Sequence, residues 1–443
     1  MKTYIVHTFG CQMNKHDSER IAGLLESCGH VPVNSDADAD IIVFNTCCVR
    51  ETADDRLYGQ VASLKVIKTG GRPDVIIAVG GCVGQRDGEA LLKHLPHVDV
   101  VFGTHNIHEL PSLIDAAERG RPVARVLECG ETFASDLPSV REHRWHAWVP
   151  ITVGCDNHCS YCIVPTVRGA ERSRPFESVV AEVDALVSDG VLEITLLGQN
   201  VNSYGRDRYG NPRFAELLTA VAATGVPRVR FATSHPKDLS DDTIAAMADT
   251  PALMPYLHLP VQHGSNRMLA AMNRRYTRES YVHRIEALRS AVPDIALSTD
   301  IIVGFPGETD DDFEETLDIV ARVAFDHAFT FIYSPREGTP AASLAETVPR
   351  PVAQARFDRL VELVRDLSLA SNERQVGTSA LCLIEGPSRR DEGVLAARTP
   401  HNRLVHAPLP RGAHADMLAG SLRTIHITGA HPWFLTGELA EDD

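Results

Sequence analysis

Three closely spaced cysteines constrain this chain more than any other feature. Cys155, Cys159 and Cys162 form a C-x3-C-x2-C run inside the segment ITVGCDNHCSYCIVPTVRG. A cubic 4Fe–4S cluster that is held by protein alone takes four cysteines. Three thiolates at this spacing would therefore hold three irons and leave the fourth iron open to another ligand.

Zinc is the alternative occupant of the same run. His158 lies within it, and a structural zinc ion takes four ligands, commonly three cysteines and one histidine. However, His158 and Cys159 are neighbours, and adjacent side chains seldom both turn towards one ion. The run therefore favours an iron–sulfur cluster over zinc.

The length and the cysteine content limit the class of protein. A chain of 443 residues is too long for one core and suggests about three domains. No apolar run reaches the roughly 18 residues that a membrane span needs, and the N-terminus lacks a cleavage site after an apolar stretch. Ten cysteines suit metal ligation in a reducing compartment better than a secreted disulfide framework. We therefore expect a cytoplasmic protein without a membrane contact.

The first third of the chain repeats an apolar run, a cysteine and a helical segment. TYIVHTFGC ends at Cys11, DIIVFNTC at Cys47 and VIIAVGGC at Cys82. This pattern predicts a parallel α/β sheet. The loops beyond the carboxyl ends of parallel strands converge, so the three thiols should gather as a second metal site. The alternative is that they pack as small hydrophobic residues.

Four further cysteines lack this context. Cys48 abuts Cys47, but side chains alternate along an extended segment, so we expect the two to point in opposite directions. For the remaining three we expect simple packing; they are Cys28, Cys129 and Cys382.

The middle of the chain alternates strand-like and helical runs. The strand-like runs are WVPITVG, LEITLLGQ, RVRFATS, YLHLPVQ, ALSTDIIVGF and HAFTFIYS. Six such β–α units predict a partial (β/α)6 barrel, whose site lies at the carboxyl ends of the strands. Three arginines follow the cysteine run, and they could either contact substrate phosphates or pair with Glu171 and Glu177; they are Arg168, Arg172 and Arg174.

The C-terminal part reads as short strands after a long helix. The runs TSALCLIEG, VLAART, RLVHAPL, DMLAGSLRTIHITGA and HPWFLTGEL predict a small all-β barrel. The net charge of −16 argues against indiscriminate nucleic-acid binding, although a local basic patch could bind RNA. Four arginines form such a candidate patch, with a solvated charged face as the alternative; they are Arg389, Arg390, Arg398 and Arg403.

Several motifs resemble the radical-SAM methylthiotransferases over essentially the whole chain. They are TFGCQMN, NTCCVRE, GGCVGQ and the C-x3-C-x2-C run, while IEGPSRRDEGVLAARTPHNRLVHA resembles a TRAM domain. The resemblance implies an N-terminal methylthiotransferase domain at 1–140, a radical-SAM domain at 141–374 and a TRAM domain at 375–438. Residues 439–443 read as an acidic tail.

The resemblance also implies two 4Fe–4S clusters and S-adenosylmethionine as cofactors. One cluster, at the C-x3-C-x2-C run, would bind S-adenosylmethionine at its open iron and generate a radical. The other, auxiliary cluster would carry the sulfur to be transferred and be held by Cys11, Cys47 and Cys82.

Two other strand ends are candidates for binding S-adenosylmethionine. Gln199 and Asn200 offer amides near the methionyl group, while Gly304 allows close approach of the adenosine and Glu308 could accept ribose hydroxyls. Both segments are equally consistent with ordinary turns before helices.

The segments GCQMN, LPVQHGSNRMLAAMNRRYT and SPREGTPAA resemble most closely one branch of the family. That branch inserts a methylthio group at C2 of N6-isopentenyladenosine next to the anticodon of tRNA. Alternatives are a sister branch acting on threonylcarbamoyladenosine or a ribosomal protein aspartate, and a non-catalytic, zinc-containing RNA-binding protein. Two positions depart from the family pattern: His158 stands where Phe is usual, and His263 replaces a Ser.

The partners follow from the same resemblance. They are the tRNA anticodon stem-loop, S-adenosylmethionine and a low-potential electron donor of the flavodoxin or ferredoxin type. We expect a monomer, and the sequence does not identify the sulfur source.

Overall fold

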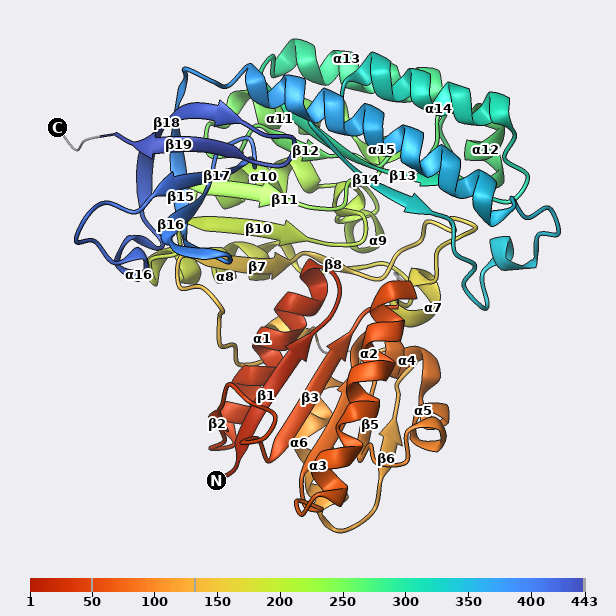
Figure 1. Ribbon diagram of the computed structural model, residues 1–443, viewed down its shortest axis with the longest axis vertical. Coiled ribbons are helices and arrows are strands. Elements are labelled where there is room, and N and C mark those ends of the chain that lie inside the picture. The colour runs from red at the N-terminus through yellow and green to blue at the C-terminus, as the bar shows by residue number, and fades with distance from the viewer. Residues whose placement is uncertain (49–50, 131–132, 441–443) are drawn as a thin grey trace.

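The computed structural model describes residues 1–48, 51–130 and 133–440. Its three parts are an N-terminal sheet with helices, a central domain, and a small barrel beside the central domain (Figure 1). Val49 and Arg50 of the NTCCVRE motif, and 441–443 of the expected acidic tail, lie outside the described residues.

The N-terminal sheet has six parallel strands in the order β2-β1-β3-β4-β5-β6. The strands β3 and β4 are mostly apolar and buried throughout, as central strands covered by helices on both faces must be. The predicted parallel α/β sheet is confirmed. The strands are Thr3–Thr8 (β1), Val31–Pro32 (β2), Ile41–Thr46 (β3), Ile76–Gly80 (β4), Val100–Phe102 (β5) and Val123–Arg125 (β6).

Helices pack on both faces of this sheet. One core joins α1 and α6 to the sheet, and the other joins α2, α4 and α5. The helices are Gln12–Ser27 (α1), Glu51–Ser63 (α2), Lys65–Thr69 (α3), Gly81–Asp87 (α4), Glu89–His94 (α5) and Leu110–Glu118 (α6).

The direction of winding reverses between β1 and β3. From β1 the helix α1 leads to β2 on one side, whereas β3, β4 and β5 follow on the other side. The connections after β1 and β3 diverge, and a parallel sheet opens a ligand crevice at such a switch point. Cys11 and Cys47, which follow these two strands, lie at that point.

The central domain is a partial barrel of six parallel strands. They form two groups, β11-β10-β7 and β12-β13-β14. Two backbone hydrogen bonds join the groups: the N–H of Val229 donates to the carbonyl oxygen of Ala252, and the N–H of Met254 donates to that of Val229. The predicted partial (β/α)6 barrel is confirmed. The strands are His146–Pro150 (β7), Glu193–Leu197 (β10), Arg228–Phe231 (β11), Tyr256–His258 (β12), Ala296–Val303 (β13) and His327–Ile332 (β14).

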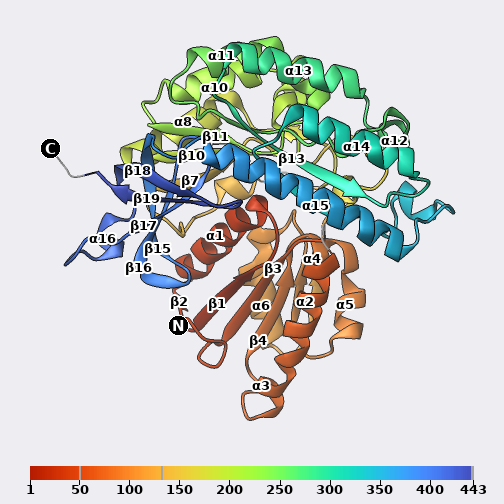
Figure 2. The same ribbon diagram turned by 45° about the horizontal axis from the view of Figure 1, so that its top comes forward.

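Helices cover the outer side of this barrel (Figure 2). Leu360 and Val364 bring the last and longest of them, α15, into the same core. No helix within the described ranges is both long and apolar enough to cross a membrane. The covering helices are Phe176–Ser188 (α8), Phe214–Ala222 (α10), Asp241–Asp249 (α11), Arg278–Ala291 (α13), Asp310–Val323 (α14) and Arg350–Glu373 (α15).

The C-terminal part is a closed barrel in the order β15-β16-β17-β19-β18. The predicted barrel is confirmed, but one predicted strand is wrong at its start. The first three residues of DMLAG belong to the helix α16 (Ala415–Leu418) instead of a strand. Gly420, with φ of +76°, follows this helix before β18 begins. The strands are Ser379–Ser388 (β15), Asp391–Arg398 (β16), Leu404–Pro408 (β17), Leu422–Ala430 (β18) and Leu435–Leu439 (β19).

Buried arginines of β11 hold this barrel on the central domain. Arg230 pairs with Glu193 at 2.9 Å and donates to the carbonyl oxygens of Thr399 and Pro400 at 2.8 and 2.9 Å. Arg228, two residues earlier, also donates to barrel carbonyls. The carbonyl of Thr399 is buried and the others are partly buried, so removal of a guanidinium would leave them without this partner.

We predict that Arg230→Ala destabilises the protein by about 3 kcal/mol, because it leaves a buried carboxylate and two carbonyls without this partner. Denaturant unfolding measures the change. Arg365→Ala is the control, since Arg365 is exposed and pairs with its neighbour Asp366, and it should change stability by less than about 0.5 kcal/mol. Equal effects of the two substitutions would contradict the proposed role of Arg230.

Candidate functional site

The C-x3-C-x2-C run lies on a loop that a short hairpin closes at its base. Strands β8 (Thr152–Val153) and β9 (Arg172–Ser173) pair antiparallel on either side of the loop. Gly154 starts the loop with φ of +80°, and a Cβ there would lie 2.0 Å from the carbonyl oxygen of Ala170. Only glycine fits this position. Because the loop follows β7, it lies at the carboxyl end of the barrel.

The three thiols of this loop are wholly or partly buried. The backbone N–H of Asn157 donates to Sγ of Cys155 at 3.4 Å, and Nη1 of Arg274 donates to Sγ of Cys159 at 3.3 Å. Burial raises the pKa of Cys155 to about 11 and that of Cys162 to about 12. These two thiols are therefore protonated at neutral pH, and binding a metal would release their protons.

Arg274 is a contact of the site that the sequence did not reveal. Its side chain is buried, donates to the carbonyl oxygen of Pro260 at 3.1 Å and lies over the ring of Tyr276. Its neighbour Arg275 is exposed. The two arginines are adjacent in the sequence, and no local pattern indicates which of them contacts the cysteines.

His158 turns away from the cysteine loop. It is exposed while Cys159 is buried, as expected of adjacent residues, so it does not complete a four-ligand set with the cysteines. Within residues 1–48, 51–130 and 133–440, no group of three or more His, Cys, Asp or Glu is arranged to hold a single metal ion. In a cubane each cysteine binds a different iron, so its ligands need not converge on one point.

The structure brings Cys11, Cys47 and Cys82 together at the carboxyl edge of the N-terminal sheet. Cys11 precedes α1, Cys47 follows β3 and Cys82 lies in the first turn of α4. A Cβ on Gly10 would lie 2.2 Å from the Cβ of Cys47, so glycine lets these segments approach closely. A hydrogen bond with Cys47, together with the charge of Arg168, outweighs burial and lowers the pKa of Cys11 to about 6.

Cys48 also belongs to this group, contrary to the prediction from alternation. Its thiol is fully buried and hydrogen-bonds to Cys82. This bond and burial raise the pKa of Cys48, and the same bond helps to lower the pKa of Cys82 to about 7. Elsewhere, Cys382 packs in the barrel core as expected.

The packing expected of the last two cysteines is wrong. Cys28 and Cys129 are both exposed. Cys28 follows the end of α1, outside the apolar face of that helix.

Arg168 reaches from the central domain into the N-terminal cysteine group. The helix α7 (Val164–Arg168) begins just after Cys162 and packs against α4. Nη2 of Arg168 donates to Asp17 at 3.2 Å, and the guanidinium lies close enough to Cys82 for its charge to lower the pKa of that thiol. Burial opposes its charge, but the negative charges of Cys82 and Asp17 outweigh burial and raise the pKa of Arg168.

The other two arginines of this segment have structural contacts. Arg174 is buried and pairs with Glu182 at 2.6 Å. Arg172 lies over the ring of Phe133 at 5.1 Å. The carboxylate partners in this segment are therefore Asp17 and Glu182 rather than the two glutamates expected.

Polar atoms at the ends of β10 and β11 lack partners among the described residues. They are Oε1 of Gln199, Oδ1 of Asn200 and Oγ of Ser234, all buried. Nδ2 of Asn200 donates to Asp238 at 2.7 Å, which fixes that amide with its oxygen free. Because buried polar atoms are normally hydrogen-bonded, these atoms fit a ligand that binds beside the cysteine loop.

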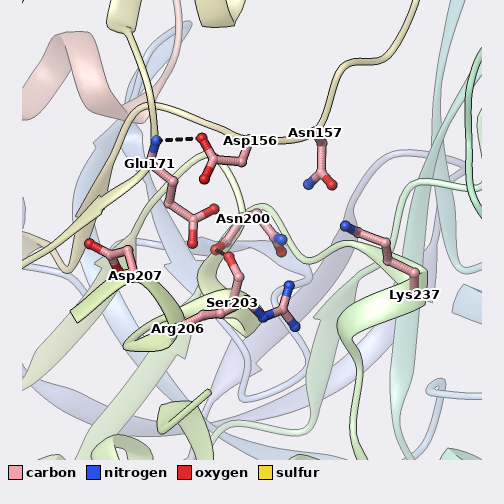
Figure 3. A pocket seen from close by; sticks show the side chains of 8 residues that line it. All are labelled: Asp156, Asn157, Glu171, Asn200, Ser203, Arg206, Asp207 and Lys237. Carbon is pink, nitrogen blue, oxygen red and sulfur yellow. Dashed lines mark hydrogen bonds between the residues drawn. The ribbon is translucent and has the colours of Figure 1, made fainter. Parts of the chain in front are cut away.

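A pocket with about 360 Å³ of empty space adjoins the loop (Figure 3). Figure 3 shows the carboxylates of Asp156, Glu171 and Asp207 on the side of the pocket away from Lys237. Burial, with the negative charges of Asp156 and Asp207, raises the pKa of Glu171 to about 7. The pocket thus presents charges of both signs, as a ligand with an amino group and a carboxylate requires.

The GFPGE segment is engaged in structural contacts. Oε2 of Glu308 accepts from the N–H of Gly304 at 2.7 Å and lies 3.4 Å from His263, and Oε1 pairs with Arg356 at 2.7 Å. A Cβ on Gly304 would lie 2.8 Å from Ala353 of α15. The side chain of Glu308 is fully buried, so in this structure it does not offer its oxygens to a ribose.

The four C-terminal arginines do not form one patch. Arg398 pairs with Glu385 at 2.8 Å, and Arg403 pairs with Asp326 of the central domain at 2.5 Å. Arg389 and Arg390 are exposed at the turn between β15 and β16. Only the latter two, among the four, are free for a partner such as RNA.

Comparisons with known proteins agree with this geometry. Residues 149–320 match the Radical SAM superfamily, and residues 3–103 match Uncharacterized protein family UPF0004. The tRNA-2-methylthio-N(6)-dimethylallyladenosine synthase of Acidothermus cellulolyticus is 51% identical, over 99% of this chain and 88% of its own length. The chain belongs to this family. The family member from Streptomyces viridosporus is 50% identical, over 99% of this chain and 87% of its own.

Solved structures share the fold. The radical S-adenosylmethionine methyltransferase TsrM from Kitasatospora setae matches with a TM-score of 0.55 at 15% identity, covering 77% of each chain. The cobalamin-dependent S-adenosylmethionine radical enzyme OxsB matches with a TM-score of 0.52 at 13% identity, covering 82% of this chain and 56% of that one. At these identities the likeness is one of fold alone.

We predict that Gly154→Ala prevents the cysteine loop from holding iron, because the added carbon collides with the backbone of Ala170. Iron content after anaerobic purification measures the loss, which should be half of the total. Gly190→Ala is a matched control: its φ is also positive, at +86°, but nothing lies within 4 Å of the added carbon. Equal iron in both variants would show that the tight turn is not needed.

Proposed function

We propose that this protein inserts a methylthio group at C2 of N6-isopentenyladenosine next to the anticodon of tRNA. Two groups of cysteines, each at the carboxyl end of a parallel sheet, carry the proposal. Membership of the family supports the substrate, because the relatives named above act, by their names, on the same nucleoside in tRNA.

The reaction requires breaking an unactivated C–H bond, and a side-chain base cannot remove this hydrogen as a proton. When bound, two 4Fe–4S clusters and S-adenosylmethionine supply the radical and the sulfur for this substitution. One cluster is held by Cys155, Cys159 and Cys162, and the other by Cys11, Cys47 and Cys82. The number of cysteines leaves one iron of each cluster open.

The residues at the ends of β10 and β11 bind S-adenosylmethionine in this proposal. The free oxygens of Gln199 and Asn200 accept hydrogen bonds from the methionyl amino group. Gly304 and Glu308 act indirectly, because they tie the turn after β13 to α15.

The partners in the proposal are tRNA and a low-potential electron donor of the flavodoxin or ferredoxin type. Arg389 and Arg390 contact the phosphates of the anticodon stem-loop, since they are the exposed members of the predicted patch. The protein acts as a monomer in the cytoplasm, where its tRNA substrate is.

We predict that Cys155→Ala and Cys82→Ala each abolish methylthiolation while each keeps half of the iron. Cys82→Ala should still form 5′-deoxyadenosine from S-adenosylmethionine, whereas Cys155→Ala should not. Cys28→Ala is the control, because this thiol is exposed and far from both groups in the fold. Mass spectrometry of tRNA nucleosides and iron assays measure the outcomes, and methylthiolated tRNA from either variant would refute the assignment.

A further inference from the structure

Each cysteine group contacts a buried arginine. Arg274 donates to Cys159 of the cysteine loop, and both belong to the central domain. Arg168 comes from the central domain, but its helix α7 packs against α4, the helix that carries Cys82 of the N-terminal group. The second contact therefore crosses between the two parts of the chain.

Arg168 is held rigidly at this place. Ile163, just before the short helix α7, and Val167, within it, are part of the N-terminal hydrophobic core. Thr104 of the N-terminal domain donates to the carbonyl oxygen of Val167 at 2.8 Å. The guanidinium is thus fixed by packing on one side and by the Asp17 ion pair on the other.

Burial of Arg168 is unfavourable in free energy unless negatively charged groups compensate its charge. Burying a guanidinium carries a desolvation penalty that one carboxylate offsets only with good geometry. Asp17 supplies one hydrogen bond at 3.2 Å and also contacts His16 at 3.2 Å. Besides Asp17, the charged neighbours of the guanidinium include Cys82 and Cys11 of the cysteine group.

We propose that Arg168 is a positioning residue that extends from the radical-SAM domain into the N-terminal site, where its charge raises the reduction potential of the cluster held there. The inference rests on the proposed function. Reduction adds negative charge to a cluster, and a fixed cation beside its ligands stabilises the reduced form more than the oxidised form. Net charge and hydrogen bonds to the sulfurs are known determinants of such potentials.

The same geometry couples the two sites. Five residues lie between Cys162 and Arg168, and four of them belong to α7. Because α7 follows the cysteine loop directly and is anchored in the N-terminal core, the same short segment positions both Cys162 and the guanidinium.

The test is the reduction potential of the N-terminal cluster in full-length Cys155→Ala protein, which lacks the other cluster. In that background Arg168→Gln should shift the potential to more negative values, as followed by electron paramagnetic resonance during a redox titration. Asp17→Asn should shift it in the opposite direction, because it removes a negative charge and frees the guanidinium. Arg172→Gln should leave it unchanged, since Arg172 lies over Phe133.

Arg168→Lys separates charge from architecture. If Arg168→Gln loses the cluster but Arg168→Lys keeps it, charge compensation is supported. If both variants lose it, Arg168 serves only the fold and the inference is overturned, as it is if the potential of Arg168→Gln equals that of the parent. Absence of any cluster in the Cys155→Ala parent would instead overturn the proposed function.

Discussion

The buried ion pair between Arg168 and Asp17 joins the two halves of the site. A guanidinium and a carboxylate that are both nearly inaccessible to water must keep their geometry, because each alone would be an uncompensated buried charge. The helix α7 brings this pair about, since Val167 anchors it in the N-terminal core. One short segment thus begins beside Cys162 of one cysteine group and ends at Arg168, next to the other group.

Both cysteine groups use the same property of parallel sheets. Connections leave the carboxyl ends of the strands, so residues that follow different strands meet at one edge. Two glycines let neighbouring segments pack where a side chain would not fit: Gly10 lies against Cys47, and Gly154 lies against the backbone of Ala170. The helix α7 lies between the N-terminal part and the central domain (Figure 1).

Local pattern was enough to predict the parallel sheet, the partial barrel, the closed C-terminal barrel and the gathering of Cys11, Cys47 and Cys82. Contacts between segments that are distant in the sequence could not be predicted from local pattern. Arg403 belongs to an apparent basic patch in sequence, but it pairs with Asp326, which is 77 residues away. Likewise, the sequence around Glu308 suggested a turn whose carboxylate is open to a ligand, whereas in the structure Arg356 of α15 pairs with it and the side chain is buried. Such partners depend on how separate elements dock, which no local spacing encodes.

Two clusters that are linked by α7 and Arg168 should lie close together. Electron paramagnetic resonance of the protein with both clusters reduced tests this most directly, because neighbouring spins interact. The spectrum should contain a magnetic interaction that is absent from the summed spectra of the Cys155→Ala and Cys82→Ala variants. A spectrum equal to that sum would show two isolated clusters and contradict the account.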